Sequence, residues 1–494
     1  MKRSLPFIVL PLLLWTGSPA FGADVRLIEA AKKNDKTAVT ALLNNAGKKV
    51  DVNAAEPDGT TALDWAVRTD NLQIAEMLVR SGADVRLANR YGVTALNLAC
   101  LNGNGAMVEI LLKAGADPNT ATPEGETALM TAARTGKVEA VKALLAHGAE
   151  VNAKETWHGQ TALMWAAAEG NADVVRVLIE AKADIRARSN GGFTALLFAA
   201  REGKIEATKA LLKGGALLNE SLQTRRGGAR GGAATAAAAP PLTAQPDNTP
   251  NAFLLAAANA HYELAAVLLD AGADPNAAPQ GFTALHQMTW VRKVGIGDNN
   301  PAPPGSGKMS SLEFVRKLVA RGANVNARVT RKPSMGTTNL NSIGATPFLL
   351  AARTADVPLM RLLKELGADP LLANDDGTTP LMVAAGVGTS SPGEDPGTEP
   401  EVLEAVKLAV ELGGDVNAVD KNGETAMHGA AYKHVPSVVR YLASKGAKTE
   451  VWDHANKRGW TPLKIVQGIP IGMNIAGDAP TRAAILELLN AKSK

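Results

Sequence analysis

Apolar and polar residues follow two recurring patterns along most of the chain. One is a short run rich in Ala and Leu that follows a Gly-x-Thr segment, as at Gly59, Thr61 and Leu63. The other places apolar residues at helical spacing, as at Ile74 and Leu78. A threonine before the first run can cap a helix with its hydroxyl group, and a glycine after the second run favours a helix end. The pattern therefore predicts pairs of short helices joined by tight turns.

The helix pair repeats with a nearly constant period. The leucine that follows the turn recurs every 33 or 34 residues, at Leu63, Leu96, Leu129, Leu163 and Leu196. A single unit of this size cannot bury its own apolar face, whereas a stack of units buries a continuous core. Once the interruptions of the pattern are set aside, the chain accommodates about 12 such units. We therefore expect an all-α solenoid.

Two motifs in each unit identify a family. Residues 58–63 (DGTTAL) are echoed at 124–129 (EGETAL), and residues 115–119 (GADPN) are echoed at 148–152 (GAEVN). These segments resemble the ankyrin repeat, whose pattern runs G-x-T-P-L-H-x-A-A and ends L-L-x-x-G-A-D-V-N. The resemblance covers about four-fifths of the chain. It implies an ankyrin-repeat α-solenoid of helix-turn-helix units with β-hairpin-like turns, and it implies protein–protein recognition.

Residues 1–22 have the layout of a cleavable export signal. A short positive region precedes an apolar stretch, LPFIVLPLLLW, and small residues follow it. We expect cleavage after Ala20 or Gly22. The apolar stretch is too short for a membrane span. The mature protein is therefore expected to be exported, to the periplasm or beyond the cell, without stable membrane insertion.

The repeat pattern is interrupted at several places. Residues 220–250 are a low-complexity segment, rich first in Arg and Gly and then in Ala and Pro, that lacks the hydrophobicity to fold. We expect it to link an N-terminal stack at 23–219 to a C-terminal stack at 251–494. Shorter insertions at 294–309 and 387–400 fall between the first and second helix of their units, so we expect them to project as loops.

Composition and motifs offer no chemistry beyond binding. Aromatic residues are 4% of the chain and the formal net charge is +4, which does not favour a nucleic-acid partner. The single cysteine, Cys100, excludes an intramolecular disulfide and a Cys-based metal cluster. The seven histidines show no metal-site spacing, and His286 and His428 occupy a structural position of the ankyrin motif. We therefore expect no enzyme activity, no catalytic or metal-binding residue and no cofactor, in a protein that is a monomer.

Two sets of residues are candidates for contact with a partner. The ninth residue after each turn glycine lies near the end of the first helix, which faces the concave groove in ankyrin proteins. Basic and apolar residues share this stripe, at Arg68, Leu101, Arg134, Arg201, Arg353 and Tyr432. Aromatic residues flank the turn glycines at Tyr91, Trp157, Phe193 and Phe282, where ankyrin proteins commonly present side chains to partners. The alternative interpretation of the stripe is that its members are solvated helix ends.

The predicted function is binding of another protein through the concave surface and the hairpin tips. One alternative is an inhibitor or immunity-type protein that covers a secreted or periplasmic enzyme. A scaffold for several envelope proteins is another, and an unrecognised hydrolase is a third. A hydrolase needs a convergent acid, base and nucleophile, and no motif of this sequence supplies them. The identity of the partner does not follow from the sequence.

Overall fold

The computed structural model describes residues 25–45, 50–222, 249–293, 302–332, 338–393, 395–469 and 476–492. The predicted export signal at 1–22 and most of the predicted linker at 220–250 lie outside these residues. The contacts divide the chain into two compact units, residues 1–157 (unit 1) and 158–494 (unit 2). In the described residues every named element is a helix, and none of these helices is long and apolar enough to cross a membrane.

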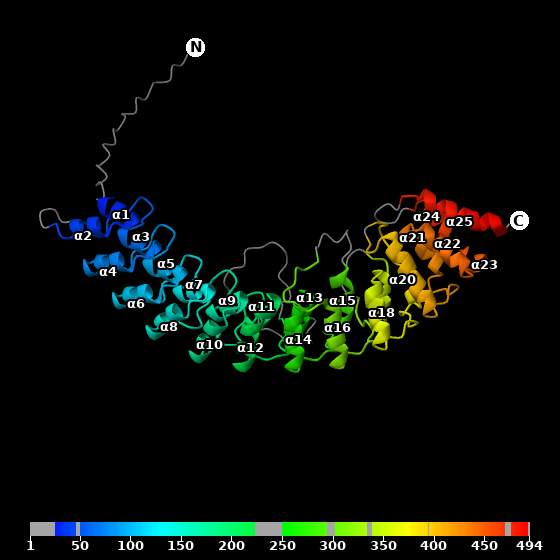
Figure 1. Cartoon of the computed structure of the whole chain (residues 1–494), viewed down its shortest axis with the longest axis horizontal. Coiled ribbons are helices and arrows are strands. Elements are labelled where there is room, and N and C mark those ends of the chain that lie inside the picture. The colour runs from blue at the N-terminus through cyan, green and yellow to red at the C-terminus, as the bar shows by residue number, and fades with distance from the viewer. Residues whose placement is uncertain are drawn as a thin grey trace, which may run out of the picture. The chain divides into compact units, whose positions relative to one another are not determined.

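Unit 1 consists of four successive helix pairs (Figure 1). They are α1 (Val25–Lys32), α2 (Lys36–Leu43), α3 (Ala62–Arg68), α4 (Leu72–Arg80), α5 (Ala95–Asn102), α6 (Gly105–Lys113), α7 (Ala128–Thr135) and α8 (Val138–Ala146). The first helix of each pair packs on the first helix of the next, from α1 through α3 and α5 to α7. The second helices form a parallel row from α2 to α8.

Unit 2 continues the same arrangement with eight further pairs and one short extra helix. Its helices are α9 (Ala162–Glu169), α10 (Ala172–Glu180), α11 (Ala195–Arg201), α12 (Ile205–Lys213), α13 (Ala252–Ala258), α14 (Tyr262–Asp270), α15 (Ala284–Arg292), α16 (Ser311–Ala320), α17 (Pro347–Arg353), α18 (Val357–Glu365), α19 (Pro380–Ala385), α20 (Glu399–Glu411), α21 (Ala426–Lys433), α22 (Pro436–Ser444), α23 (Thr449–Trp452), α24 (Pro462–Val466) and α25 (Ala479–Lys492). Twelve pairs are therefore present in the described part of the chain, which confirms the all-α solenoid of about 12 units.

The threonine of the Gly-x-Thr turn begins the first helix of the unit, as expected. At the start of α3, Thr61 Oγ1 accepts a hydrogen bond from the Asp64 backbone at 3.2 Å, while the Asp64 carboxylate accepts one from the Thr61 backbone at 2.8 Å. This reciprocal capping box satisfies two backbone donors that the helix leaves unpaired. An isolated antiparallel bridge joins Ala55 to Thr61 across the turn. In the described part of unit 1, the β-hairpin-like turns are thus reduced to single bridges, at Ala55, Ala88 and Ala121.

The core lies between the rows of helices and is built from small residues on the first helix and branched residues on the second. Ala66 of α3 and Ala132 of α7 have no exposed surface, and the same is true of Ile74 and Leu78 of α4. Alanine in the first helix lets neighbouring helices approach closely, so the apolar area of Leu side chains is removed from water. Leu129 of α7 is likewise buried.

The repeats on either side of the predicted linker pack directly on each other. Helix α11 contacts α13, the backbone N–H of Leu222 donates to Pro250 O at 3.1 Å, and a bridge joins Ser221 to Asn251. The segment between these contacts lies outside the described residues. A boundary between two stacks at 220–250 therefore stays a prediction.

Replacing a turn glycine tests how tightly the repeats stack. We expect Gly92→Ala to lower the free energy of unfolding by more than Gly115→Ala. Both residues have a positive φ, 73° and 94°, which costs an alanine about 1–2 kcal/mol. A Cβ on Gly92 would also lie 2.7 Å from Pro123 Cδ of the next repeat, whereas Gly115 has no atom within 4 Å of that position. Urea unfolding of both variants measures the difference. Equal losses of unfolding free energy would show that Pro123 moves aside without a measurable free-energy cost.

Candidate functional site

In unit 1 the predicted stripe is present at the surface. Arg68 ends α3 and is exposed, with its guanidinium 5.2 Å from the centroid of the Trp65 ring. Leu101 lies one repeat further on α5 and is 51% exposed, which is unusual for a leucine. Arg134 on α7 is partly exposed and forms an ion pair with Glu126 at 3.6 Å. Three consecutive repeats thus present a cation, an apolar side chain and a cation at equivalent positions.

The base of this stripe is held by a small polar cluster around Trp65. The Trp65 indole Nε1 donates to Glu56 Oε2 at 2.7 Å, and Lys32 Nζ lies 2.5 Å from Glu56 Oε1. The hydrogen bond from Lys32 lowers the pKa of Glu56, so the carboxylate is charged at neutral pH. Because the ring is fixed by Glu56, it offers Arg68 a rigid face to stack on.

In unit 2 the stripe is only partly available. Arg201 ends α11 and is exposed, with its guanidinium 5.1 Å from the ring centroids of both Phe193 and Phe198. Its Nε also donates to Glu202 Oε1 at 2.8 Å. Two aromatic rings therefore hold this arginine in place while its side chain stays 42% exposed.

Arg353 and Tyr432 differ from the exposed stripe that the sequence predicts. The Arg353 side chain is largely buried and pairs with Asp395 at 3.3 Å. Tyr432 is 5% exposed, and its hydroxyl donates to Glu424 Oε1 at 3.1 Å. Both positions lie beside the insertion at 387–400. The sequence prediction treated them as exposed helix ends and did not take account of contacts with this insertion. As placed, neither side chain is an exposed anchor for a partner.

The predicted hairpin aromatics fall into two classes. Trp157 is 76% exposed and Tyr91 is 57% exposed, and the Arg90 guanidinium lies 4.8 Å from the centroid of the Tyr91 ring. Phe193 and Phe282 are half-buried. Phe282 makes an edge-on contact with Trp290, with centroids 5.2 Å apart. The first two are thus available to a partner, whereas the last two mainly support neighbouring side chains.

His286, His428 and Cys100 are buried, and the two histidines hold the starts of their helices. His286 has no exposed surface, and its Nδ1 lies 3.1 Å from the backbone nitrogen of Thr283, which donates to it. His428 repeats this arrangement with Thr425. Burial lowers the pKa of each imidazole to about 4 and raises the pKa of the Cys100 thiol to about 12. In the described ranges, no group of three or more His, Cys, Asp or Glu residues is placed to hold a metal ion.

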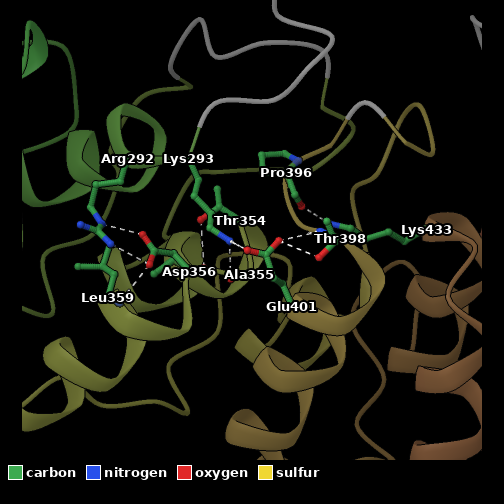
Figure 2. A network of polar contacts seen from close by, with 11 residues as sticks. Arg292, Lys293, Thr354, Ala355, Asp356, Leu359, Pro396, Thr398, Glu401 and Lys433 are labelled. Carbon is green, nitrogen blue, oxygen red and sulfur yellow. Dashed lines mark hydrogen bonds and ion pairs between the residues drawn. The ribbon is translucent and has the colours of Figure 1, made fainter. Parts of the chain in front are cut away.

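The sequence interpretation missed a polar network in unit 2, shown in Figure 2. Arg292, the last residue of α15, forms a bidentate ion pair with Asp356 at 2.7 and 3.1 Å. The next residue, Lys293, bonds Glu401 at 2.7 Å and the Ala355 carbonyl at 3.2 Å. These contacts join the end of α15 to the starts of α18 and α20.

The geometry of each carboxylate in this network follows from its place at a helix start. Asp356 caps α18, accepting from Leu359 N at 3.2 Å, and is 99% buried. Glu401 closes the capping box of α20, accepting from Thr398 N at 2.9 Å. The hydrogen bond from Lys293 lowers the pKa of Glu401 to about 2. In the sequence, Lys293 directly precedes the insertion at 294–309 and Glu401 directly follows the one at 387–400.

A second polar cluster surrounds Glu424. Its Oε1 accepts from Tyr432 and, at 2.7 Å, from Asn456, whereas its Oε2 is buried and has no hydrogen-bond partner in the described structure. Burial raises the pKa of Glu424 to about 7. The cluster lines a cavity of about 250 Å³.

Comparisons with known proteins agree with this architecture. A family model described as ankyrin repeats (3 copies) matches residues 27–122, 96–189, 154–221 and 399–466, which together are just over half of the chain. A segment of 128 residues, 26% of the chain, is 32% identical to the BRCA1-associated RING domain protein 1 of Caenorhabditis elegans. The match covers 16% of that protein, well below two thirds of its length.

Proposed function

Because the chain belongs to the ankyrin-repeat family, we propose that it binds a partner protein through the stripe of unit 1, formed by Arg68, Leu101 and Arg134. Ankyrin repeats indicate protein–protein interaction, and proteins built from them are typically not enzymes. The observation that carries the proposal is the exposure of Arg68 and Leu101 and the partial exposure of Arg134, at equivalent positions of consecutive repeats. Tyr91, between the first two, extends the surface toward the hairpin tips.

The chemistry of the stripe favours an acidic partner surface with an apolar centre. Arginine holds a carboxylate through two parallel hydrogen bonds, and a stacked guanidinium loses little freedom when it does so. Leu101 would supply apolar contact between the two cations, where water is excluded on binding. Arg201, with Phe193 beneath it, offers the same combination in unit 2.

We further propose that binding takes place outside the cytoplasm. The support is the layout of residues 1–22, with its positive start, apolar stretch and small residues before Ala20 and Gly22. N-terminal sequencing of the protein recovered from cell fractions tests this. Recovery of an intact Met1 in the cytoplasmic fraction would contradict it.

Charge reversal tests the stripe. A partner recovered with the wild-type protein should lose at least tenfold in affinity for the Arg68→Glu/Arg134→Glu double variant, because both carboxylate contacts become repulsive. Arg80→Glu is the matched control, since Arg80 is exposed on the second helix α4 and has only a weak contact with Glu76. The melting temperature should not change in any variant. Equal affinity of the double variant and the control would rule out the stripe.

The same complex separates the remaining alternatives. An inhibitor or immunity-type role requires a single enzyme bound at one copy per chain, with its activity lost in the complex. A scaffold requires several partners bound at the same time. Size-exclusion chromatography with light scattering, together with an activity assay of the recovered enzyme, distinguishes the two.

A further inference from the structure

A cavity of about 720 Å³ lies in unit 2 at the start of α20. We call it the α20 pocket. It is lined by Lys293 at the end of α15, by Pro396, Thr398 and Glu401 around the start of α20, and by Lys433 and His434 at the end of α21. The volume is in the range of pockets that hold small molecules.

Lys433 is the unusual residue of this pocket. Its side chain enters the network of Figure 2 from α21, opposite Arg292 and Lys293. It is 7% exposed, and in the described structure its one hydrogen bond runs from Nζ to Pro396 O at 2.8 Å. A lysine ammonium carries three N–H donors and is almost never buried unless it is paired. Two donors of this ammonium therefore have no acceptor in the described part of the chain.

The carboxylates near Lys433 are committed to other groups. Asp395 pairs with Arg353, and Glu401 pairs with Lys293 and caps α20. Glu399 accepts from the backbone of Ser437 at 3.0 Å. In the described residues none of them lies within ion-pair distance of Lys433. The Lys433 ammonium is thus a buried cation without an ion-pair partner in the described residues.

A second group at the pocket also lacks a partner. His434 lines the pocket, and its Nε2 is shielded from solvent without a hydrogen bond in the described structure. Burial lowers the pKa of this imidazole. A buried polar atom without a partner costs free energy that a bound ligand can recover. Lys433 and His434 both line the α20 pocket.

We propose that the α20 pocket binds a carboxylate group, which accepts hydrogen bonds from the two unused donors of Lys433. A carboxylate supplies the charge that the ammonium lacks, and its oxygens accept several hydrogen bonds at once. The group belongs either to a small free acid or to the carboxyl terminus of a peptide. Neither source depends on the stripe of unit 1, so this inference stands apart from the proposed function.

Binding should depend on the protonation of Lys433. Burial lowers the pKa of its ammonium to about 8, and a bound carboxylate should raise it again. Affinity should therefore fall as pH rises through about 8. The charged groups around Lys433 are Arg292 and Lys293 at the end of α15, Arg353 on α17, Asp395 before α20, Glu399 and Glu401 on α20, and His434 after α21.

The test is calorimetric titration of the full chain with two pairs of probes. The first pair is succinate and succinamide, and the second is the tripeptide Gly-Ala-Ala with a free or an amidated carboxyl terminus. We expect saturable binding of at least one acid and none of its amide, and the acid that binds identifies the source. Absence of saturable binding by both acids at 10 mM or below, on the order of weak ligand affinities, would overturn the proposal.

Two variants assign the binding to Lys433. Lys433→Met removes the charge at similar volume, and Lys433→Gln also keeps one N–H for Pro396 O. Each should weaken binding by at least tenfold, while the exposed Lys445→Met should leave it unchanged. Circular dichroism confirms that the variants are folded. Wild-type affinity in a folded Lys433→Gln protein would exclude this residue and the proposal with it.

Discussion

Asp356→Ala is expected to lower the free energy of unfolding of unit 2 by about 3–5 kcal/mol. The Asp356 carboxylate is almost fully buried and accepts two hydrogen bonds from Arg292. It also caps α18. The substitution leaves the Arg292 guanidinium largely buried without its counter-charge. Removing one partner of a buried ion pair destabilises a protein more than replacing both partners. Loss of the cap adds about 1 kcal/mol. Urea unfolding followed by circular dichroism measures the change.

A double variant separates the two causes. Arg292→Met/Asp356→Ala removes the uncompensated charge, so it should recover most of the loss and leave the cost of the cap. Asp356→Asn keeps an acceptor for Leu359 N and loses only the charge. A loss below about 1 kcal/mol for Asp356→Ala alone would contradict this prediction, since the guanidinium would then have found water or another partner.

Glu424→Gln is expected to change the pH dependence of stability. Burial raises the pKa of Glu424 from about 4.5 in the unfolded chain to about 7 in the folded protein. Between these values the folded state holds a proton that the unfolded state has released, so stability falls as pH rises from about 4.5 to about 7. The total is on the order of 3 kcal/mol. The variant mimics the protonated side chain, so it should be more stable than the wild type at pH 8 and equal to it below about pH 4.5.

The two buried histidines change stability in the opposite direction. His286 and His428 have pKa values of about 4 when folded, so stability rises with pH between about 4 and 6.5. Both contributions are present in the wild type and in Glu424→Gln, and they cancel in the difference between the two. Thermal unfolding of both proteins from pH 4 to pH 8 therefore isolates Glu424. A difference that does not vary with pH would show that Glu424 is already charged in the folded state.

The fold was largely predictable because it depends on a local pattern. Each first helix needs a threonine cap such as Thr61 and small residues such as Ala66, and these recur with the period in the sequence. The number of units follows from the length once the insertions are removed. The boundary proposed at 220–250 depends on long-range packing between α11 and α13, which no local pattern reports.

The candidate surface was predictable only where a repeat lacks insertions. Arg68, Leu101 and Arg201 are exposed because nothing in the sequence near them adds structure over the helix end. Arg353 occupies the same register but meets Asp395, a residue of an insertion from the next repeat. The position of a residue in the repeat predicts which way its side chain points. It does not predict which residue of an inserted loop will contact that side chain. The α20 pocket was missed for this reason.

The ion pair between Lys293 and Glu401 has a consequence for how this protein can change over evolutionary time. Arrays of this kind ordinarily gain or lose whole repeats, since each repeat contacts only its neighbours. Here the bond connects α15 to α20 and passes over the repeat of α17 and α18. Deleting that middle repeat would place the repeats of Lys293 and Glu401 one repeat closer together than this ion pair requires, and it would also remove Asp356. Recombination within residues 284–411 should therefore be tolerated poorly, while the uninterrupted repeats of unit 1 remain free to vary in number.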